Sequence, residues 1–328
     1  MRLKLMIGTR SLPHLLLTAL LWANSAASAD AQFPDLFELQ AQYVPYVELA
    51  GPEPTESQVS SYEVSLNVPV KLSDKSYLIP GASYHVDSIG YRDVVPGFDA
   101  LRSFHAADFS LLYVQLLPRD VSLALRFAPG LAGDFKRVDS GLVRYNAVVM
   151  ATKSFSPRLV FGGGGMTTFR FGSFLALPAL YLAWEPSASF KLETFLPAFV
   201  EATYRIGSRV ELGARAEVNG NAYAVRDAGV ADDWPCTEQV DDPTTAADES
   251  VAQERRCLDH VAYSLASAGL TARVRLFSSV WFALYGGYTL FRRLEPMNAG
   301  DRRVPGEVQD LPNAPVFRAS LIFRIPSD

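Results

Sequence analysis

The stretch Ser61–Leu72, SYEVSLNVPVKL, alternates apolar and polar residues along its whole length. Every even-numbered residue from Tyr62 to Leu72 is apolar or aromatic, and every odd-numbered residue from Ser61 to Lys71 except Pro69 is polar. Successive side chains of a β-strand point to opposite sides, whereas a helix needs apolar residues three and four positions apart. The stretch therefore predicts a strand with one apolar and one polar face.

The same period of two recurs along the chain in segments of about ten residues. It is clearest at 121–127, 210–219 and 317–325. Residues 190–206 can be read as two strands or as one strand bent at Pro197, and 259–276 changes face near Ser267, which predicts a β-bulge. The predicted fourteen strands are 36–49, 61–72, 77–87, 107–117, 121–129, 141–153, 158–171, 174–184, 190–196, 198–206, 209–226, 259–276, 280–294 and 315–325.

The connections between these segments alternate in length. Short ones are 73–76, 118–120, 154–157, 185–189, 207–208 and 277–279, and long polar ones are 50–60, 88–106, 130–140, 227–258 and 295–314. Two of the second set, near Gly172 and Pro197, are tight. A membrane barrel with small periplasmic turns and larger external loops has this alternation, whereas Greek-key sandwiches mix loop lengths. The prediction is an all-β, antiparallel transmembrane β-barrel of about 14 strands (12–14), with both termini on the periplasmic side.

Aromatic residues flank the short turns. Amphipathic rings favour the interface between hydrocarbon and lipid headgroups, so these residues predict a girdle, although aromatics also favour strand ends in other β proteins. They are Tyr77, Phe155, Trp184, Phe190, Phe277 and Trp281.

The N-terminus has the features of a secretory signal peptide. Arg2, Lys4 and Arg10 precede the apolar run 15–23, and Ala27-Ser28-Ala29 is a small-x-small cleavage motif. The apolar run is too short to span a bilayer as a helix. The predicted division is a cleaved signal peptide over 1–29, cut near Ala29/Asp30, and a barrel domain over 30–328. Without its three basic residues, 27 basic residues face 35 acidic ones, and a net charge of about −8 argues against a nucleic-acid partner.

The longest predicted loop, 227–258, is strongly acidic and contains both cysteines of the chain. In an exported protein, Cys236 and Cys257 most simply form one disulfide, which would close a 22-residue span. The carboxylates could bind divalent cations or lipopolysaccharide, but they lack the ordered spacing of a dedicated calcium loop. The loop is interpreted as a solvated surface loop, and neither a metal site nor a cofactor is expected.

The polar faces of the predicted strands carry charges of both signs. Such a face can line a water-filled channel, or it can close a narrow barrel by ion pairing. Fourteen strands should leave an opening, since about eight already fill with side chains. The pore-lining candidates are Glu63, Arg126, Arg144, Arg170, Glu201, Arg205, Glu211, Arg215, Glu217, Arg273, Arg275 and Arg318.

Two further motifs invite a chemical interpretation. Ser83, His85 and Asp87 share one strand face, but alternate residues lie about 7 Å apart, which is too far for a direct Ser–His–Asp relay. Polar residues lining a rim are therefore the favoured interpretation. The run Gly162–Gly165 lacks the Lys-Ser/Thr of a phosphate-binding loop and instead predicts a bend or a close approach of another segment.

With these features in place, the mature chain resembles Gram-negative outer-membrane barrels of the size of fourteen-strand porins. The stretch 177–223 (LPALYLAWEPSASFKLETFLPAFVEATYRIGSRVELGARAEVNGNAY) is similar to an uncharacterised porin-like family with no assigned activity. The chain departs from the usual terminal aromatic residue, because Phe323 is followed by five more residues.

The resemblance implies a place in the outer membrane, contact with its lipid and lipopolysaccharide, and insertion by the barrel-assembly machinery. The expected function is a porin-like passive channel for small polar solutes. A closed structural or adhesive barrel, an outer-membrane lipase or protease, and a secreted soluble β-sandwich are the alternatives.

Overall fold

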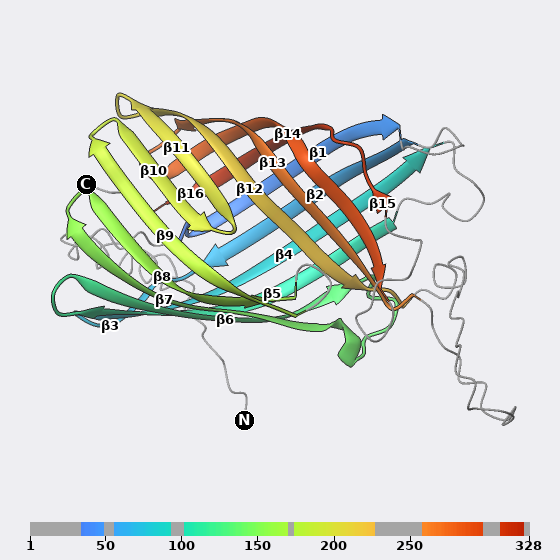
Figure 1. Ribbon diagram of the computed structural model, residues 1–328, viewed down its shortest axis with the longest axis horizontal. Helices are drawn as coiled ribbons and strands as arrows, with labels where there is room; N and C mark the ends of the chain where they lie inside the picture. Colours follow the sequence, from blue (N-terminus) through green and yellow to red (C-terminus); the bar gives the residue numbers. More distant parts are fainter. Residues whose placement is uncertain are drawn as a thin grey trace, which may run out of the picture.

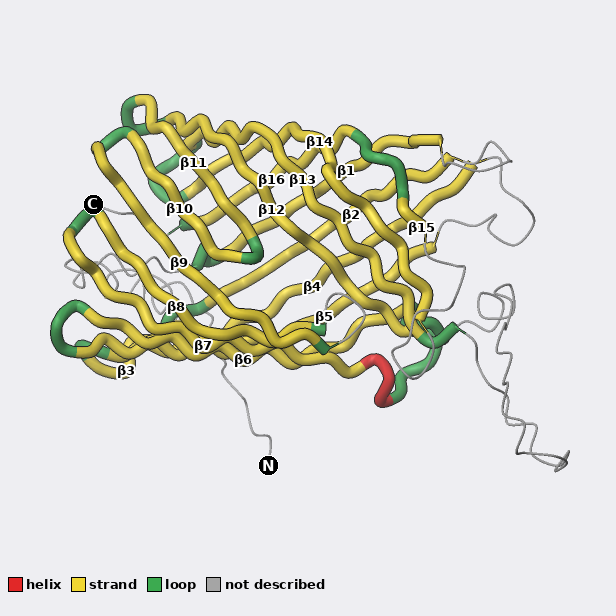
Figure 2. The backbone as a smooth tube through the Cα atoms, in the orientation of Figure 1, coloured by secondary structure: helices red, strands yellow, loops and turns green. Residues whose placement is uncertain are grey.

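The computed structural model describes residues 34–48, 56–92, 102–169, 174–226, 258–297 and 309–324. They form a single antiparallel sheet that closes on itself (Figures 1 and 2). The wall strands are β1 (Phe37–Glu48), β2 (Glu56–Asn67), β4 (Ser76–Arg92), β5 (Arg102–Leu117), β6 (Val121–Gly133), β7 (Val143–Ser156), β8 (Leu159–Thr168), β9 (Leu175–Ser187), β10 (Phe190–Leu196), β11 (Phe199–Ile206), β12 (Val210–Ala224), β13 (His260–Arg275), β14 (Val280–Met297) and β16 (Pro315–Phe323).

Each wall strand pairs with its neighbour in the sequence, and β16 closes the barrel by pairing with both β14 and β1. Two short strands extend this wall: β3 (Val70–Ser73) pairs with β4, and β15 (Gln309–Asp310) pairs with β14. One 3₁₀ turn, η1 (Ser140–Leu142), lies between β6 and β7. The predicted fourteen-strand antiparallel barrel is confirmed.

Two uncertain segments are resolved by the strand register. Residues 190–206 are two strands, because Phe195 pairs with Phe199 across the turn at Pro197. The predicted bulge is present between Ala266 and Ser267, where Leu290 of β14 is the additional residue.

The predicted strand 61–72 is wrong as one element. It ends at Asn67 and resumes as β3, because Pro69 has no N–H to donate to a ladder. Several strands also extend further than predicted, so β2 begins at Glu56 and β4 continues to Arg92.

The six short connections lie at one end of the barrel, called here the short-turn end, and the longer ones lie at the other, the long-loop end (Figure 1). The first and last wall strands begin and end at the short-turn end, where Phe37 pairs with Phe323. Both ends of the described barrel therefore lie on the same side, as the even strand number requires.

The outer face of the wall is apolar. Large hydrophobic side chains on alternate positions of nearly every strand are solvent-exposed, among them Leu39, Phe109, Val149, Leu270 and Leu284. Such a surface is unfavourable in water and suits hydrocarbon, so the closed wall is a membrane-spanning one. Among the described residues no helix is long or apolar enough to cross a membrane.

Aromatic residues mark both edges of this apolar surface. At the short-turn end Phe155, Phe277 and the edge-to-face pair Trp184–Phe190 face outward, as predicted. Tyr77 and Trp281 do not, because strand alternation directs them inward, where they are 7% and 9% exposed. At the long-loop end a second row, absent from the prediction, runs from β6 and β7 to the ends of β8 and β9 through Phe127, Tyr145, Phe169 and Phe174.

The two rows are separated by the thickness of an outer-membrane apolar band. Tyr145 and Phe155 lie ten residues apart on β7, which at about 3.3 Å per residue and a strand tilt of about 40° is about 25 Å along the barrel axis.

The glycine run lies in β8, where the predicted close approach of another segment is present. A Cβ added to Gly162 or Gly164 would overlap backbone atoms of β7, whereas Gly163 and Gly165 have only ordinary contacts. The alternate glycines on the inner face therefore allow β7 and β8 to pack together closely.

Several predictions fall outside the described residues. These are the signal peptide, Arg170, Cys236 and Cys257, and the acidic loop up to residue 257. The signal peptide, the disulfide and the loop's role stay predictions.

Candidate functional site: the barrel lumen

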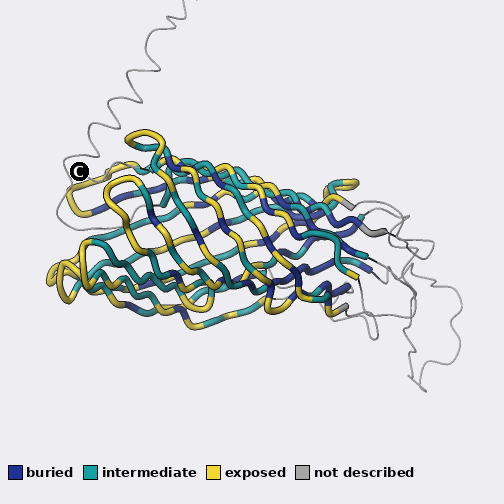
Figure 3. The backbone as a smooth tube through the Cα atoms, turned by 90° about the horizontal axis from the view of Figure 1, so that it is seen from above, coloured by how far each residue is buried: buried dark blue, intermediate teal, exposed yellow. Residues whose placement is uncertain are grey.

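The half of the lumen nearest the long-loop end is filled by apolar side chains from the wall itself. Figure 3 shows the buried positions gathering toward that end. The cluster, called here the apolar plug, takes residues from opposite sides of the barrel, and each is at most 5% exposed. It consists of Val44, Val59, Ile89, Phe104, Ala106, Ala132, Tyr223, Val225, Leu258, Val261, Tyr263, Leu265, Tyr285, Leu294, Leu311, Ala314 and Val316. This half of the lumen is closed along the axis.

A chain of polar contacts crosses the lumen beside the plug. The Tyr223 hydroxyl on β12 donates to Asp87 on β4 at 2.5 Å and accepts from the Asn221 amide at 2.8 Å. Arg144 on β7 donates to the side-chain amide oxygen of Asn221 at 2.5 Å. Its guanidinium also makes a two-pronged contact with Asp108 on β5 at 2.7 and 3.1 Å. Buried polar groups need partners, and these contacts tie three sectors of the wall together.

His85 lies at the edge of this chain, and the predicted distance argument is wrong for the His85–Asp87 pair. Although alternate strand residues are widely spaced at the backbone, the His85 Nε2 reaches the Asp87 carboxylate at 2.9 Å, because side chains can lean along the strand. The Ser61 hydroxyl donates to the same carboxylate at 2.5 Å, and Glu63 faces the other imidazole nitrogen at 3.5 Å. The Ser61 hydroxyl thus contacts Asp87 and not His85.

A second polar cluster, called here the clasp, holds the long-loop end together above the plug. The Arg226 guanidinium contacts Asp139 at 2.8 Å and Asp259 at 2.9 Å. The backbone N–H of Arg226 donates to the Asp134 carboxylate at 2.7 Å. His260 pairs with Asp259 at 2.6 Å. The hydrogen bond from Arg226, with smaller contributions from Arg137 and the Gly141 N–H, holds the pKa of Asp139 well below its usual range.

The clasp brings together two strands that are distant in sequence. Ala224, at the end of β12, pairs in parallel with Gly133 of β6, and the Asp134 N–H donates to the Ala224 carbonyl at 3.0 Å. In Figure 2 the short helical turn of the 134–142 segment lies beside the ends of β12 and β13. At the long-loop end the barrel is therefore narrowed by a contact that bypasses β7 to β11.

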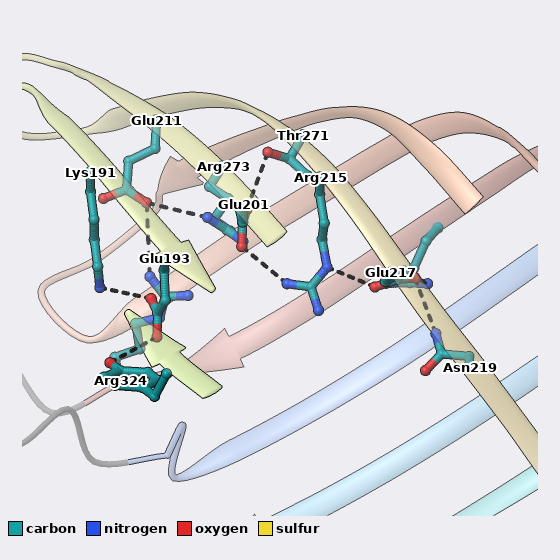
Figure 4. A network of polar contacts seen from close by, with 12 residues as sticks. Lys191, Glu193, Glu201, Glu211, Arg215, Glu217, Asn219, Thr271, Arg273 and Arg324 are labelled. Atoms are coloured by element: carbon teal, nitrogen blue, oxygen red, sulfur yellow. Dashed lines mark hydrogen bonds and ion pairs between the residues drawn. The ribbon is translucent and has the colours of Figure 1, made fainter. Parts of the chain in front are cut away.

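The half of the lumen nearest the short-turn end is a cavity of about 720 Å³, called here the vestibule. Its lining is dominated by charged side chains from β10 to β13, β16 and the start of β1, and β14 adds aromatic and apolar residues. Figure 4 shows how these side chains meet inside the wall. Glu201 accepts from Arg215 at 3.0 Å and from Arg273 at 2.5 Å, and Arg215 also contacts Glu217 at 2.6 Å.

Two of the guanidinium groups that line the vestibule are less neutralised than the others. Arg205 has a half-exposed side chain and, among the described residues, a single carboxylate contact, to Glu211 at 3.5 Å. Arg275 lies over the Trp281 ring at 5.7 Å and makes no ion pair with the described residues. Because Arg keeps its charge at every physiological pH, both groups present positive charge to whatever enters the vestibule.

The wall opposite the charged one is largely apolar. Its inward-facing residues form cross-strand rows, one of them running Val114, Ala124, Met150, Gly164 and Ala179 from β5 to β9. A neighbouring row includes Arg126, which faces the lumen between Leu112 and Val148. The lumen is thus amphipathic, with ionic groups on one side and apolar groups on the other.

The structure brings most of the predicted pore-lining residues together, but not all in one place. Glu201, Arg205, Glu211, Arg215, Arg273, Arg275 and Arg318 line the vestibule, and Glu217 pairs with Arg215 and Arg318 at its inner end. Arg144 and Glu63 belong instead to the polar contacts beside the plug. Whether the vestibule residues line a conducting pore stays a prediction.

The sequence interpretation did not identify Asp108, Asn221 or Tyr223. Each lies on the inward face of its strand, so alternation alone was a sufficient signal for the direction in which it points. Their mutual contacts cross the lumen between β5, β7 and β12, and no local pattern encodes such contacts.

A family model described as "Domain of unknown function (DUF6268)" matches residues 100–304. No curated protein shows a significant match. The chain is similar in structure to the COG4313 outer membrane channel from Pseudomonas putida F1, with 8% identity, 90% of this chain and 98% of that chain covered, and a TM-score of 0.43.

It is also similar to the toluene transporter TodX from Pseudomonas putida, with 10% identity, 93% and 92% coverage and a TM-score of 0.40. A third likeness is to the NanC porin, with 11% identity, 88% and 99% coverage and a TM-score of 0.33. At TM-scores below 0.5 these likenesses carry no argument about mechanism, which has to come from the chain's own residues.

Proposed function

The chain belongs to the DUF6268 family, and from this premise we propose that it is a passive outer-membrane channel for small polar solutes. Solutes enter it from the short-turn end. The observation that carries the proposal is the vestibule, a cavity of about 720 Å³ whose charged wall is built from alternating Arg and Glu side chains. A water-filled lumen lined with both signs passes ions and polar molecules by size and local field.

The proposed solute preference is anionic. Most lumenal guanidinium groups are neutralised by Glu201, Glu211 or Glu217, but Arg205 and Arg275 keep much of their charge available near the short-turn end. Positive groups at the entrance of a low-dielectric cavity concentrate anions there.

A closed structural barrel is the second candidate, and the apolar plug favours it. The plug blocks the axis at the long-loop end, so a channel requires either displacement of the plug or an exit through the wall. A hydrolase is less favoured, because the Ser61 hydroxyl donates to Asp87 and His85 also turns to that carboxylate.

The proposal includes export and assembly. The signal peptide over 1–29 would direct the chain across the inner membrane, and the mature barrel would be inserted by the barrel-assembly machinery with its short turns in the periplasm. Lipopolysaccharide would then surround the long-loop end.

Single-channel recording in planar bilayers tests the proposed function. The expected result is current steps with a reversal potential that indicates anion preference in a salt gradient. Arg205→Glu and Arg275→Glu should each shift that potential toward cations. Lys153→Glu is the matched control, because Lys153 lies near the same end but on the outer face, over Phe155. A folded, inserted protein without current steps contradicts the proposal and favours the closed barrel.

A further inference from the structure

The barrel wall is incomplete above the β10–β11 hairpin. Pairing between β9 and β10 ends at Leu180 and Leu196, and pairing between β11 and β12 ends at Phe199 and Glu217. Beyond these pairs β9 continues to Leu175 and β12 to Ala224, without a described strand between them. Figure 1 shows the short hairpin ending well before its neighbours.

The opening lies within the apolar band, toward its outer side. Leu180 is seven residues from Ser187 on β9, and Glu217 is seven residues from Val210 on β12. Seven residues at about 3.3 Å and a tilt of about 40° rise about 18 Å from the short-turn end, in a band about 25 Å tall. The opening therefore faces the outer leaflet.

Its edges carry backbone groups that hydrocarbon cannot satisfy. Val218 N–H donates to Ala198 at the hairpin turn, so by alternation the N–H and C=O groups of Gly220 and Ala222 point into the opening. Unpaired backbone groups are strongly unfavourable in lipid, so whatever occupies the opening must form hydrogen bonds. Pro178, on the opposite edge, has no N–H and suits an unpaired edge.

The two sides of the opening differ in chemistry. On the β12 side Asn219 faces inward and is exposed, although Glu217 and Asn221, two positions before and after it, are 5% and 6% exposed. Its amide donates to Glu217 at 3.1 Å, which leaves its carbonyl oxygen available to a ligand (Figure 4). On the β9 side the apolar lumenal row ends at Ala179, beside the last residue that pairs with β10.

We propose that this opening is a lateral window through which a single-chain amphiphile passes between the outer leaflet and the vestibule. The hydrogen-bonding, uncharged head contacts Asn219 and the free edge of β12, and the chain lies along the apolar row that ends at Ala179. This inference goes beyond the proposed function, because it assigns a second class of cargo and a lateral route that leaves the apolar plug in place.

Spin labelling of the protein in lipid nanodiscs tests the window. With Cys236 and Cys257 replaced by Ser, a nitroxide is attached to Asn219→Cys, and its collisions with oxygen, which enters lipid, and with a water-soluble nickel chelate are measured. The matched controls are Thr203→Cys, which lines the vestibule, and Leu270→Cys, which is 70% exposed on the outer face. Heat-modifiable migration in gels verifies that each variant is folded.

The expected result is that the label at position 219 responds to both reagents, that at position 203 mainly to nickel and that at position 270 mainly to oxygen. Added decanoylglycerol should immobilise the label at position 219 in a saturable manner and leave the other two unchanged. A label at position 219 that responds to one reagent alone, or that ignores decanoylglycerol, overturns the proposal. Conductance of the same preparation distinguishes the two proposals. If current steps are recorded but the label at position 219 fails its test, only the window is refuted. If the label passes its test but no current steps are recorded, only the polar channel is refuted.

Discussion

Arg226 and Asp139 are 87 positions apart in the sequence and meet at the long-loop end, where the guanidinium Nε donates to the carboxylate at 2.8 Å. The same guanidinium also contacts Asp259, so one side chain connects the end of β12, the 134–142 segment and the start of β13. This contact accompanies the pairing of Ala224 with Gly133, which draws β12 toward β6 and away from β9. The clasp, the narrowed outer end and the lateral opening therefore share one geometric origin.

Replacing Arg226 by Gln should destabilise the barrel. The substitution leaves the carboxylates of Asp139 and Asp259 without their cation, and losing hydrogen bonds to charged groups costs about 2 kcal/mol. Urea unfolding in lipid vesicles measures the loss. Arg137→Gln is the control, since Arg137 also contacts Asp139, at 3.0 Å, but is 59% exposed and should contribute less than about 1 kcal/mol. Equal losses in the two variants would show that the clasp has no special role.

The contribution of Asp139 should depend on pH in one direction. Because contacts with Arg226 lower the pKa of Asp139 in the folded state, the stabilisation is fully present above the ordinary carboxyl pKa of 3.8. It is lost as the pH falls from there through the lowered pKa of the folded protein. The difference in unfolding midpoint between the natural protein and Asp139→Asn should be constant from pH 8 to 5 and shrink below pH 3.8. A difference that grows on acidification contradicts this assignment.

The facing of side chains could be predicted from the sequence, but their contacts across the lumen could not. A period of two assigns Glu201, Arg215 and Arg273 to one inner face, and the structure places them there together. Which inner residues meet depends on the stagger of the closed barrel and on the contact between β12 and β6. That contact joins Ala224 to Gly133, and no local pattern encodes it.

Turn chemistry and strand parity account for the remaining differences. Alternation through Pro69 made 61–72 resemble one strand, although proline cannot complete the ladder. Position beside a turn suggested that Trp281 belongs to the outer girdle, yet its parity on β14 directs it into the vestibule beneath Arg275 and Arg324. For an aromatic residue near a strand end, its place in the in–out alternation of the strand therefore predicts whether the ring faces lipid or lumen better than its distance from a turn does.

The glycine run offers a matched pair of substitutions. Gly164→Ala should destabilise the barrel by about 1–3 kcal/mol, because the added Cβ overlaps the Val149 carbonyl and forces β7 and β8 apart. Gly165→Ala should be nearly neutral, since its Cβ has only the Leu177 carbonyl nearby, at 3.9 Å. Both are measured by urea unfolding in vesicles. If the two variants unfold at the same urea concentration, close strand approach is not the reason for the run.

Truncating Tyr223 should open the plugged half of the lumen. Its fully buried ring stacks on Phe104 at 5.1 Å, so Tyr223→Ala leaves a cavity at the centre of the plug and should cost about 3–5 kcal/mol. Because the vestibule behind it is an open, charged cavity, water should then connect the two ends, and single-channel conductance should rise. Tyr223→Phe keeps the ring but leaves Asp87 without one of its donors, so it should lose about 1–3 kcal/mol without a gain in conductance. A similar conductance in both variants would mean that the ring does not close the axis.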